Sequence, residues 1–207
     1  MKRLAQELTL EGQPAAFAGS VMNSSADLVA RTRQGEQDAF RLIFERYSRP
    51  VLSFIYDMVG NRELAEDLTQ ETFVRAYRSL ASLRDEAKLS TWLFAIAKNV
   101  ARESFRARAR TNSQVDLDDE TVLNLRDREP VPVNQLLSKE LNAVIERSLA
   151  ALDDDKRLVF TLKVFQQCSY EEIAEITGFS IPKLKTDLHR ARTEMRKRIG
   201  PYVESWS

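Results

Sequence analysis

Residues 169–199 constrain the fold more tightly than any other stretch of this chain. Ser169 and Glu172 have the spacing of a capping box, in which the two residues satisfy free N–H groups at the start of a helix. Gly178 stands where that helix would end in a left-handed residue, and Ser180 is an N-cap for a second helix. The pattern therefore predicts two helices joined by a short turn that contains glycine.

The second of these helices is basic. From Lys183 to Arg198 it carries seven cationic and two acidic side chains, while Leu184, Leu188 and Met195 give it one apolar side. A tight helix pair with a basic second member is typical of a helix-turn-helix, whose second helix enters the major groove of DNA. An ordinary pair of packed helices with a solvated cationic face is the alternative.

The charge of the chain is separated into blocks. Its 31 Lys and Arg residues balance 31 Asp and Glu residues, so the net charge is zero. Residues 98–110 nevertheless hold five cations and one carboxylate, and residues 116–129 hold six carboxylates and two cations. Because a polyanion responds to the local field, overall neutrality does not argue against nucleic-acid binding.

The content of cysteine and histidine excludes several kinds of site. Cys168 is the only cysteine and His189 the only histidine, which leaves no internal disulfide and no Cys/His cluster for zinc. We expect Cys168 to be a small packed residue, with a redox role left open, and His189 to face DNA or solvent. The sequence thus predicts no catalytic residues, no metal site and no cofactor.

The hydropathy of the chain argues against a membrane protein. No apolar run approaches the roughly 18 residues of a membrane helix. The N-terminal segment is interrupted by Gln6, Glu7, Glu11 and Gln13, so it lacks the apolar core of a secretory signal. We therefore expect a cytoplasmic protein with no direct membrane insertion.

Apolar residues recur at three- and four-residue steps, and no alternating strand pattern occurs. The expected fold is all-α, with two small helical domains joined by a flexible acidic linker and a helix-turn-helix at the end of the C-terminal domain. The expected boundaries are an N-terminal extension at 1–24, a first domain at 25–111, a linker at 112–136 and a second domain at 137–203.

Local signals predict several helix ends in the first domain. Pro50 should end or kink the first long helix, because proline lacks the N–H that the helix needs. Gly60 and Asn61 should separate that helix from the next. Ser90 or Thr91 should cap the last helix of the domain.

The middle of the chain carries three strings that need a joint explanation. On a helix over 65–80, four polar side chains share one face, opposite Leu68, Phe73 and Tyr77. Residues 83–99 form a loop that runs into an aromatic-rich helix, and the cationic tract follows. Aromatic and cationic side chains beside a loop suit a single-strand binding surface, since bases stack on rings while Arg and Lys hold phosphates. Trp92 and Ile96 are instead expected in the core.

These strings, in this order and spacing, resemble the bacterial sigma factors of the extracytoplasmic-function (ECF) class, two-domain members of the sigma-70 family. The string DLTQETFVRAYRSL is similar to the family's core-polymerase-binding helix, STWLFAIAKNVARE to its promoter-melting helix, and SYEEIAEITGFSIPKLKTDLHRAR to its reader of the −35 element. The resemblance covers about residues 25–203. It implies an RNA polymerase sigma factor that directs the core enzyme to a set of promoters and starts DNA melting, in a stress response under an anti-sigma factor.

The resemblance also implies roles for individual residues. Contacts with the clamp of the largest polymerase subunit fall to Asp67, Gln70, Glu71 and Arg75. Contacts with the −10 element fall to Leu83, Arg84, Lys88, Ser90, Asn99, Arg102 and Arg106. Contacts with the −35 element fall to Lys183, Lys185, Thr186, His189 and Arg190. The flap of the second-largest polymerase subunit is a further implied partner.

One departure from the family pattern affects the second domain. Asp187 stands close to where a basic residue is usual. Its carboxylate would oppose phosphate contact but could accept a hydrogen bond from a cytosine amino group. The sequence preference at the −35 element is therefore open.

Two other functions were compared with this interpretation. A conventional helix-turn-helix repressor or activator would read a palindrome as a dimer, but it leaves the polar face at 67–71 and the tract at 83–110 without a role. A nuclease would need carboxylates that converge on a metal, whereas the acidic groups here fall in the linker or along solvated helix faces. The leading prediction is a promoter-specificity subunit that is not an enzyme.

Overall fold

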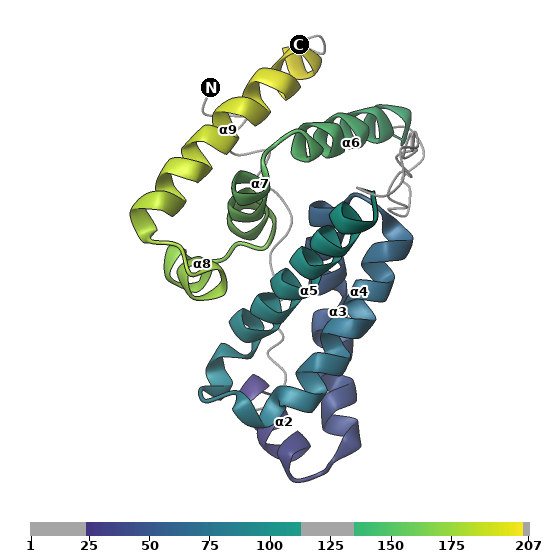
Figure 1. The fold of residues 1–207 in the computed structure, drawn as a ribbon, viewed down its shortest axis with the longest axis vertical. Helices are drawn as coiled ribbons and strands as arrows, with labels where there is room; N and C mark the ends of the chain where they lie inside the picture. The colour runs from purple at the N-terminus through teal and green to yellow at the C-terminus, as the bar shows by residue number, and fades with distance from the viewer. Residues whose placement is uncertain (1–23, 113–134, 205–207) are drawn as a thin grey trace.

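The computed structural model describes residues 24–112 and 135–204 (Figure 1). Across these two segments the chain forms helices and turns without a strand, which confirms the all-α prediction. The first module contains α2 (Ser25–Arg33), α3 (Gln37–Val59), α4 (Arg62–Ser79), η2 (Leu80–Ser82), η3 (Glu86–Lys88) and α5 (Leu89–Asn112). The second module contains α6 (Gln135–Ala150), α7 (Asp154–Phe160), η4 (Thr161–Phe165), α8 (Tyr170–Thr177) and α9 (Ile181–Glu204).

The predicted extension at 1–24 and linker at 112–136 lie almost entirely outside the described residues. At the borders of the linker, Asn112 is still part of α5 and Gln135 already begins α6. The flexibility of the linker stays a prediction.

The first module is built around α3, against which α2, α4 and α5 pack. Ile43, Phe54 and Ile55 of α3 and Leu93 of α5 are fully buried. The rings of Phe54 and Phe94 meet edge to face with their centroids 5.4 Å apart. Burial of each such side chain stabilises the fold by about 1.5–3 kcal/mol, so this core fixes the positions of α4 and α5.

Pro50 does not end the first long helix, so the prediction of two helical pieces at that point was wrong. The helix α3 runs without a break from Gln37 to Val59 and contains Pro50 in its interior. Proline removes one backbone donor from the helix. The next residue, Val51, and then Phe54 are fully buried, and their packing offsets that loss.

The ends of the helices follow local chemistry in most places. Gly60 adopts a left-handed conformation with φ 70° and ends α3, and the side chain of Asn61 accepts a hydrogen bond from the Leu64 amide at 2.8 Å. The sequence predicted both the end of α3 at Gly60 and the N-cap at Asn61. The helix α5 is not capped by Ser90 or Thr91, because η3 leads directly into it and Asp85 caps that turn instead, accepting from the Ala87 amide at 3.0 Å.

The second module has an unusual turn between α7 and α8. Asp153 caps α7 by accepting from the Lys156 amide at 3.1 Å. After Phe160 the helix widens into the π turn η4, in which the Gln166 amide donates to the Thr161 carbonyl at 3.0 Å. The backbone closes this turn when the Cys168 amide donates to the Leu162 carbonyl at 3.0 Å.

The two modules also pack against each other. The helix α8 lies alongside α5, and α3 contacts η4, α6 and α7 (Figure 1). The guanidinium of Arg157, on α7, donates to the Met58 carbonyl at the end of α3 at 2.8 Å. It also donates to the carbonyls of Leu149, Ala150 and Leu152 at distances of 2.8 to 3.0 Å. One side chain therefore joins the last turns of α3 and α6 to α7.

A search of the described helices for a membrane-spanning segment finds none with the necessary length and apolar character.

Candidate nucleic-acid interface

The helix-turn-helix predicted at 169–199 is present as α8 and α9. Ser169 Oγ accepts from the Glu172 amide at 3.1 Å, and the Glu172 carboxylate accepts from the Ser169 amide at 2.6 Å, which completes the capping box. Gly178 ends α8 with φ 77°. Leu184 and Leu188 are buried, so the helix is held with one fixed face outward.

The outward face of α9 holds most of the residues expected at the −35 element. Lys185, Thr186, His189 and Arg190 are all exposed within its first three turns. The Thr186 hydroxyl donates to the Pro182 carbonyl at 3.0 Å, which leaves its oxygen free to accept from a ligand. These four side chains form a continuous polar and cationic surface.

Lys183 and Asp187 do not belong to that surface. The Lys183 ammonium forms ion pairs with Asp187 and, at 3.0 Å, with Asp155. It also lies 4.1 Å from the centre of the Phe179 ring. The hydrogen bond to Asp187 is the main cause that raises the pKa of Lys183. Because Asp187 is only 9% exposed, its carboxylate faces the protein, and the idea that it reads a cytosine is not supported.

The residues expected at the −10 element occupy several environments. Arg84, Lys88, Asn99 and Arg106 are exposed, while Ser90 and Arg102 are half-buried. Leu83 differs from all of these, because it is only 5% exposed and packs in the core of the first module. The structure thus gives the Leu83 side chain a packing role, and a base could meet only its backbone.

The loop between α4 and α5 is held by a residue that the sequence did not single out. The guanidinium of Arg33, at the end of α2, donates to the carbonyls of Leu80 and Leu83. It also pairs with the Glu86 carboxylate at 2.7 Å. Arg33 therefore fixes the path of the loop that carries Arg84.

Two cations of α5 face the second module. The Lys98 ammonium donates to the Ile176 carbonyl at 2.6 Å, and burial is the main cause that lowers the pKa of Lys98. Arg102 pairs with Asp155 at 3.0 Å. Trp92 and Ile96, which were expected in the core, are partly buried against it.

The residues expected to bind polymerase share one face of α4. Asp67, Gln70 and Glu71 are exposed. The guanidinium of Arg75 pairs with Glu71 at 2.7 Å and with Glu103 of α5, also at 2.7 Å. These hydrogen bonds, with Glu71 as the larger cause, raise the pKa of Arg75. Arg75 thus links the α4 face to α5.

An aromatic groove lies beside this face and was not predicted. Its volume is about 500 Å³, and it is lined by Phe40, Phe44, Gln70, Phe73, Val74, Tyr77 and Arg78. Phe40 and Tyr77 meet edge to face with centroids 4.9 Å apart. Tyr77, which the helical spacing placed on one face with Leu68 and Phe73, is 54% exposed. We refer to these lining residues as the α3–α4 groove.

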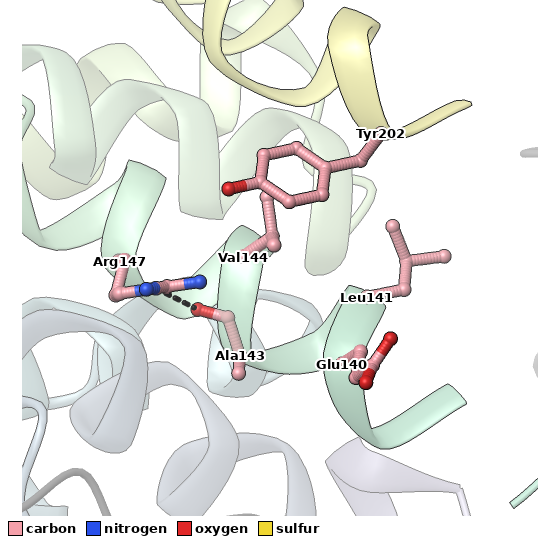
Figure 2. Close-up of a pocket in the computed structure, with 6 residues that line it drawn as sticks. All are labelled: Glu140, Leu141, Ala143, Val144, Arg147 and Tyr202. Atoms are coloured by element: carbon pink, nitrogen blue, oxygen red, sulfur yellow. Dashed lines mark hydrogen bonds between the residues drawn. The ribbon is translucent and has the colours of Figure 1, made fainter. Parts of the chain in front are cut away.

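A second hollow, of about 380 Å³, lies between α6 and the end of α9 (Figure 2). It is lined by Glu140, Leu141, Ala143, Val144, Arg147 and Tyr202. The Arg147 side chain folds back along α6 and donates to the Ala143 carbonyl at 3.3 Å. None of the residues expected to bind polymerase or DNA takes part in this hollow.

The described residues show no sign of redox or metal chemistry. Cys168 is 8% exposed, and burial raises the pKa of its thiol to about 11, so the reactive thiolate is disfavoured. Among residues 24–112 and 135–204, no three His, Cys, Asp or Glu side chains gather as metal ligands would.

Two family models match this chain. The model of Sigma-70 region 2 matches residues 43–111, and that of Sigma-70, region 4 matches residues 143–195. The ECF RNA polymerase sigma-E factor of Haemophilus influenzae is 33% identical over 182 residues, which cover 85% of this chain and 95% of that protein. The factor of the same name from Escherichia coli K12 is 32% identical over 181 residues, with 85% and 94% covered.

Two solved structures share the fold. The sigma factor RpoE from Bartonella quintana, in complex with the anti-sigma factor NepR, has a TM-score of 0.65 and 22% identity, covering 78% of this chain and 96% of that chain. CnrH in complex with the cytosolic domain of CnrY has a TM-score of 0.63 and 22% identity, covering 84% and 95%. At this level of identity, the similarity concerns the arrangement of helices.

Proposed function

The chain belongs to the ECF class of the sigma-70 family, the RNA polymerase subunits that direct the core enzyme to promoters, and we propose that its two modules divide this work between separate surfaces. The first module binds core polymerase and the melted −10 element, and the second reads the −35 duplex. The chain itself catalyses no covalent step, and it acts in the cytoplasm together with the polymerase.

The outward face of α9 is the proposed reader of the −35 element. Residues near the N-terminus of a recognition helix reach base edges in the major groove. Lys185, Thr186, His189 and Arg190 are exposed there, and Arg190 has the donor geometry for the two acceptors of a guanine. Lys183 is a weaker candidate, because its ammonium is already paired with Asp155 and Asp187.

The proposed −10 site lies around the loop between α4 and α5. The exposed amide of Asn99 can hydrogen-bond an unpaired base, and the exposed guanidinium groups of Arg84 and Arg106 can hold phosphates. Ser90 lies beside them on α5. Capture of unpaired bases offsets the few kcal/mol needed to unstack them, so binding itself drives melting.

The proposed polymerase-binding surface combines the α4 face with the α3–α4 groove. Asp67, Gln70 and Glu71 supply exposed polar groups, and Gln70 also lines the groove. Protein interfaces typically place aromatic residues at the centre and polar residues at the rim. We propose that this surface receives the clamp of the largest polymerase subunit, whose contacting helix should be apolar on one side and basic beside it.

Regulation and the remaining polymerase contact are also proposals. RpoE was solved with an anti-sigma factor. We propose that an anti-sigma factor controls this chain as well, by covering its polymerase- and DNA-binding surfaces. We further propose that the second module contacts the flap of the second-largest subunit.

One observation carries the proposal: a single chain contains both the exposed α4 face and the helix-turn-helix. The two lie in the segments that match sigma-70 regions 2 and 4, respectively. Run-off transcription with purified core polymerase on genomic fragments tests it. We expect transcripts with discrete start sites. A chain that binds duplex DNA tightly alone, ignores core polymerase and supports no transcript would instead be a conventional repressor or activator.

A charge reversal tests the polymerase surface separately. Glu71→Lys should weaken core binding at least about tenfold, because like charges across an interface repel and suppress association. Glu45→Lys is the matched control, since Glu45 is also an exposed carboxylate in the interior of a helix of the first module. Equal binding by the two variants would remove Glu71 from the interface.

A further inference from the structure

The contact between the modules uses cations that the proposed function assigns to DNA. Figure 1 shows α8 lying alongside α5. At one end of this contact, the Lys88 ammonium meets the Glu175 carboxylate at 2.5 Å. Next to it, the Lys98 ammonium donates to the carbonyl of Ile176 at 2.6 Å. Carbonyls in the last turn of a helix lack partners within the helix and carry partial negative charge, so the Lys98 ammonium suits this position.

The other end of the contact is centred on one carboxylate. Asp155 Oδ1 lies 3.0 Å from Arg102 of α5, and its Oδ2 lies 3.0 Å from Lys183 of α9. The ring of Phe179 lies beneath both cations, with its centroid 5.9 Å from the Arg102 guanidinium and 4.1 Å from the Lys183 ammonium. Asp155 therefore ties a residue expected at the −10 element to one expected at the −35 element.

We propose that this contact is a latch, formed by Lys88, Lys98 and Arg102 on one side and Glu175, the Ile176 carbonyl and Asp155 on the other, which closes the chain when no polymerase is bound. The inference rests on the proposed function, because Lys88 and Arg102 are the cations expected at the −10 strand. A guanidinium paired with Asp155 cannot present the same N–H groups to a phosphate. Closing and −10 binding therefore compete for these cations.

The latch is built to open. Its charged partners are 34 to 51% exposed in the two outer pairs, Arg102–Asp155 and Lys88–Glu175. Exposed ion pairs are weak and are screened by salt, so the binding energy of core polymerase is sufficient to separate the modules. The chain then releases Lys88 and Arg102 from their carboxylate partners only when the polymerase is present.

Replacing the two carboxylates of the latch with neutral amides tests the proposal. The double variant Asp155→Asn/Glu175→Gln removes both acidic partners and preserves side-chain shape. The matched control is Asp154→Asn/Glu171→Gln, which neutralises two exposed carboxylates outside the latch. Like the test variant, it removes one carboxylate from the first turn of α7 and one from α8. Both variants lose the same net charge, so general electrostatic effects on DNA binding cancel.

The first readout is the distance between the modules in the full chain. Spin labels are placed at Glu66→Cys and Arg196→Cys, two exposed sites on α4 and α9, in a Cys168→Ala background. The test variant should populate longer distances than the wild type and the control. If the three distance distributions coincide, the latch does not exist.

The second readout is the affinity of the polymerase-free chain for a fluorescein-labelled single strand that carries the non-template −10 sequence of a mapped promoter. The test variant should bind about threefold to tenfold more tightly than the control, because the closed fraction lowers the apparent affinity. In assembled holoenzyme the difference should vanish. Longer distances without tighter binding would refute the link between the latch and the −10 site. A wild-type chain that supports no transcription would overturn the proposed function while leaving the distance result in force.

Discussion

Replacing Arg157 with methionine should destabilise the second module although this residue is not expected to contact DNA. The methionine keeps an unbranched apolar stem and removes the guanidinium. That group donates four hydrogen bonds, to the carbonyls of Leu149, Ala150, Leu152 and Met58. Three of these acceptors end α6 or begin the turn after it, and the variant takes one donor from each of them, although the Leu149 carbonyl still accepts from the Leu152 amide at 3.0 Å.

The magnitude follows from those four bonds. A hydrogen bond that involves a charged group contributes about 1.5–3 kcal/mol, but Arg157 is half-buried and water can replace part of what is lost. We therefore expect the free energy of unfolding to fall by about 2–4 kcal/mol. Arg157→Lys should recover less than about half, because an ammonium lacks the planar fork that reaches carbonyls on both sides.

Urea unfolding followed by far-UV circular dichroism measures this effect. Arg147→Met is the matched control, since Arg147 is exposed on α6 and its hydrogen bond to the Ala143 carbonyl is long at 3.3 Å. The control should change the free energy of unfolding by less than about 0.5 kcal/mol, as surface substitutions usually do. If Arg157→Met is as stable as the control, the carbonyl cluster contributes nothing and the reasoning is wrong.

Three further outcomes can be measured. Tyr77→Ala should weaken core polymerase binding about fivefold to thirtyfold without lowering the free energy of unfolding, because Tyr77 is 54% exposed. Phe73→Ala should weaken binding too, but it should also lower the free energy of unfolding by about 3–5 kcal/mol, because Phe73 is buried. Binding titration measures the first effect and urea unfolding the second. Gly178→Ala should destabilise by about 1–3 kcal/mol because φ is +77°, and the helical Gly200→Ala should be neutral or stabilising in the same unfolding assay. Alkylation of Cys168 at pH 8 should be at least about 100-fold slower in the native than in the unfolded chain. Burial raises the pKa of the Cys168 thiol to about 11 in the folded chain. The contribution of the neutral thiol to the free energy of unfolding is therefore complete below the pKa of the unfolded chain and is lost as the pH rises towards 11. Cys168→Ala should remove this loss of stability at alkaline pH.

The parts of the fold that could be predicted from sequence are those set by neighbouring residues. The capping box at Ser169, the left-handed Gly178 and the cap at Asn61 each depend on contacts within four residues. The buried side of α9 follows from helical spacing alone. These signals are local, so the sequence contains all of the information that they need.

The failures come from tertiary packing that overrides local preference. Pro50 was expected to interrupt a helix, but burial of Val51 and Phe54 keeps α3 continuous. Tyr77 has the spacing of a core residue, yet the Phe40 ring covers only one side of it, and it stays 54% exposed. Leu83 was assigned to DNA by resemblance, and its side chain is used to close the core instead.

Residues that act over long separations could not be found at all. Arg33 bonds a loop about 50 positions away, and Arg157 reaches Met58 across 99 positions. In the sequence Asp155 is the last of three consecutive aspartates, and only the packed modules reveal its two cationic neighbours. The sequence thus contains no local signal for the contacts that hold the loop after α4 and join the two modules.

The π turn Thr161–Phe165 has a consequence for evolution of this chain. A π turn holds one more residue than the α-helical turn it replaces, and each residue of a helix rotates the following chain by about 100°. Because the extra residue is taken up inside the π turn, deleting one of its five residues would return the segment to an α-helical turn without adding that rotation. The segment before α8 can therefore lose one residue while the recognition helix keeps its place, and substitutions on α9 remain the direct way to change the promoter that this chain selects.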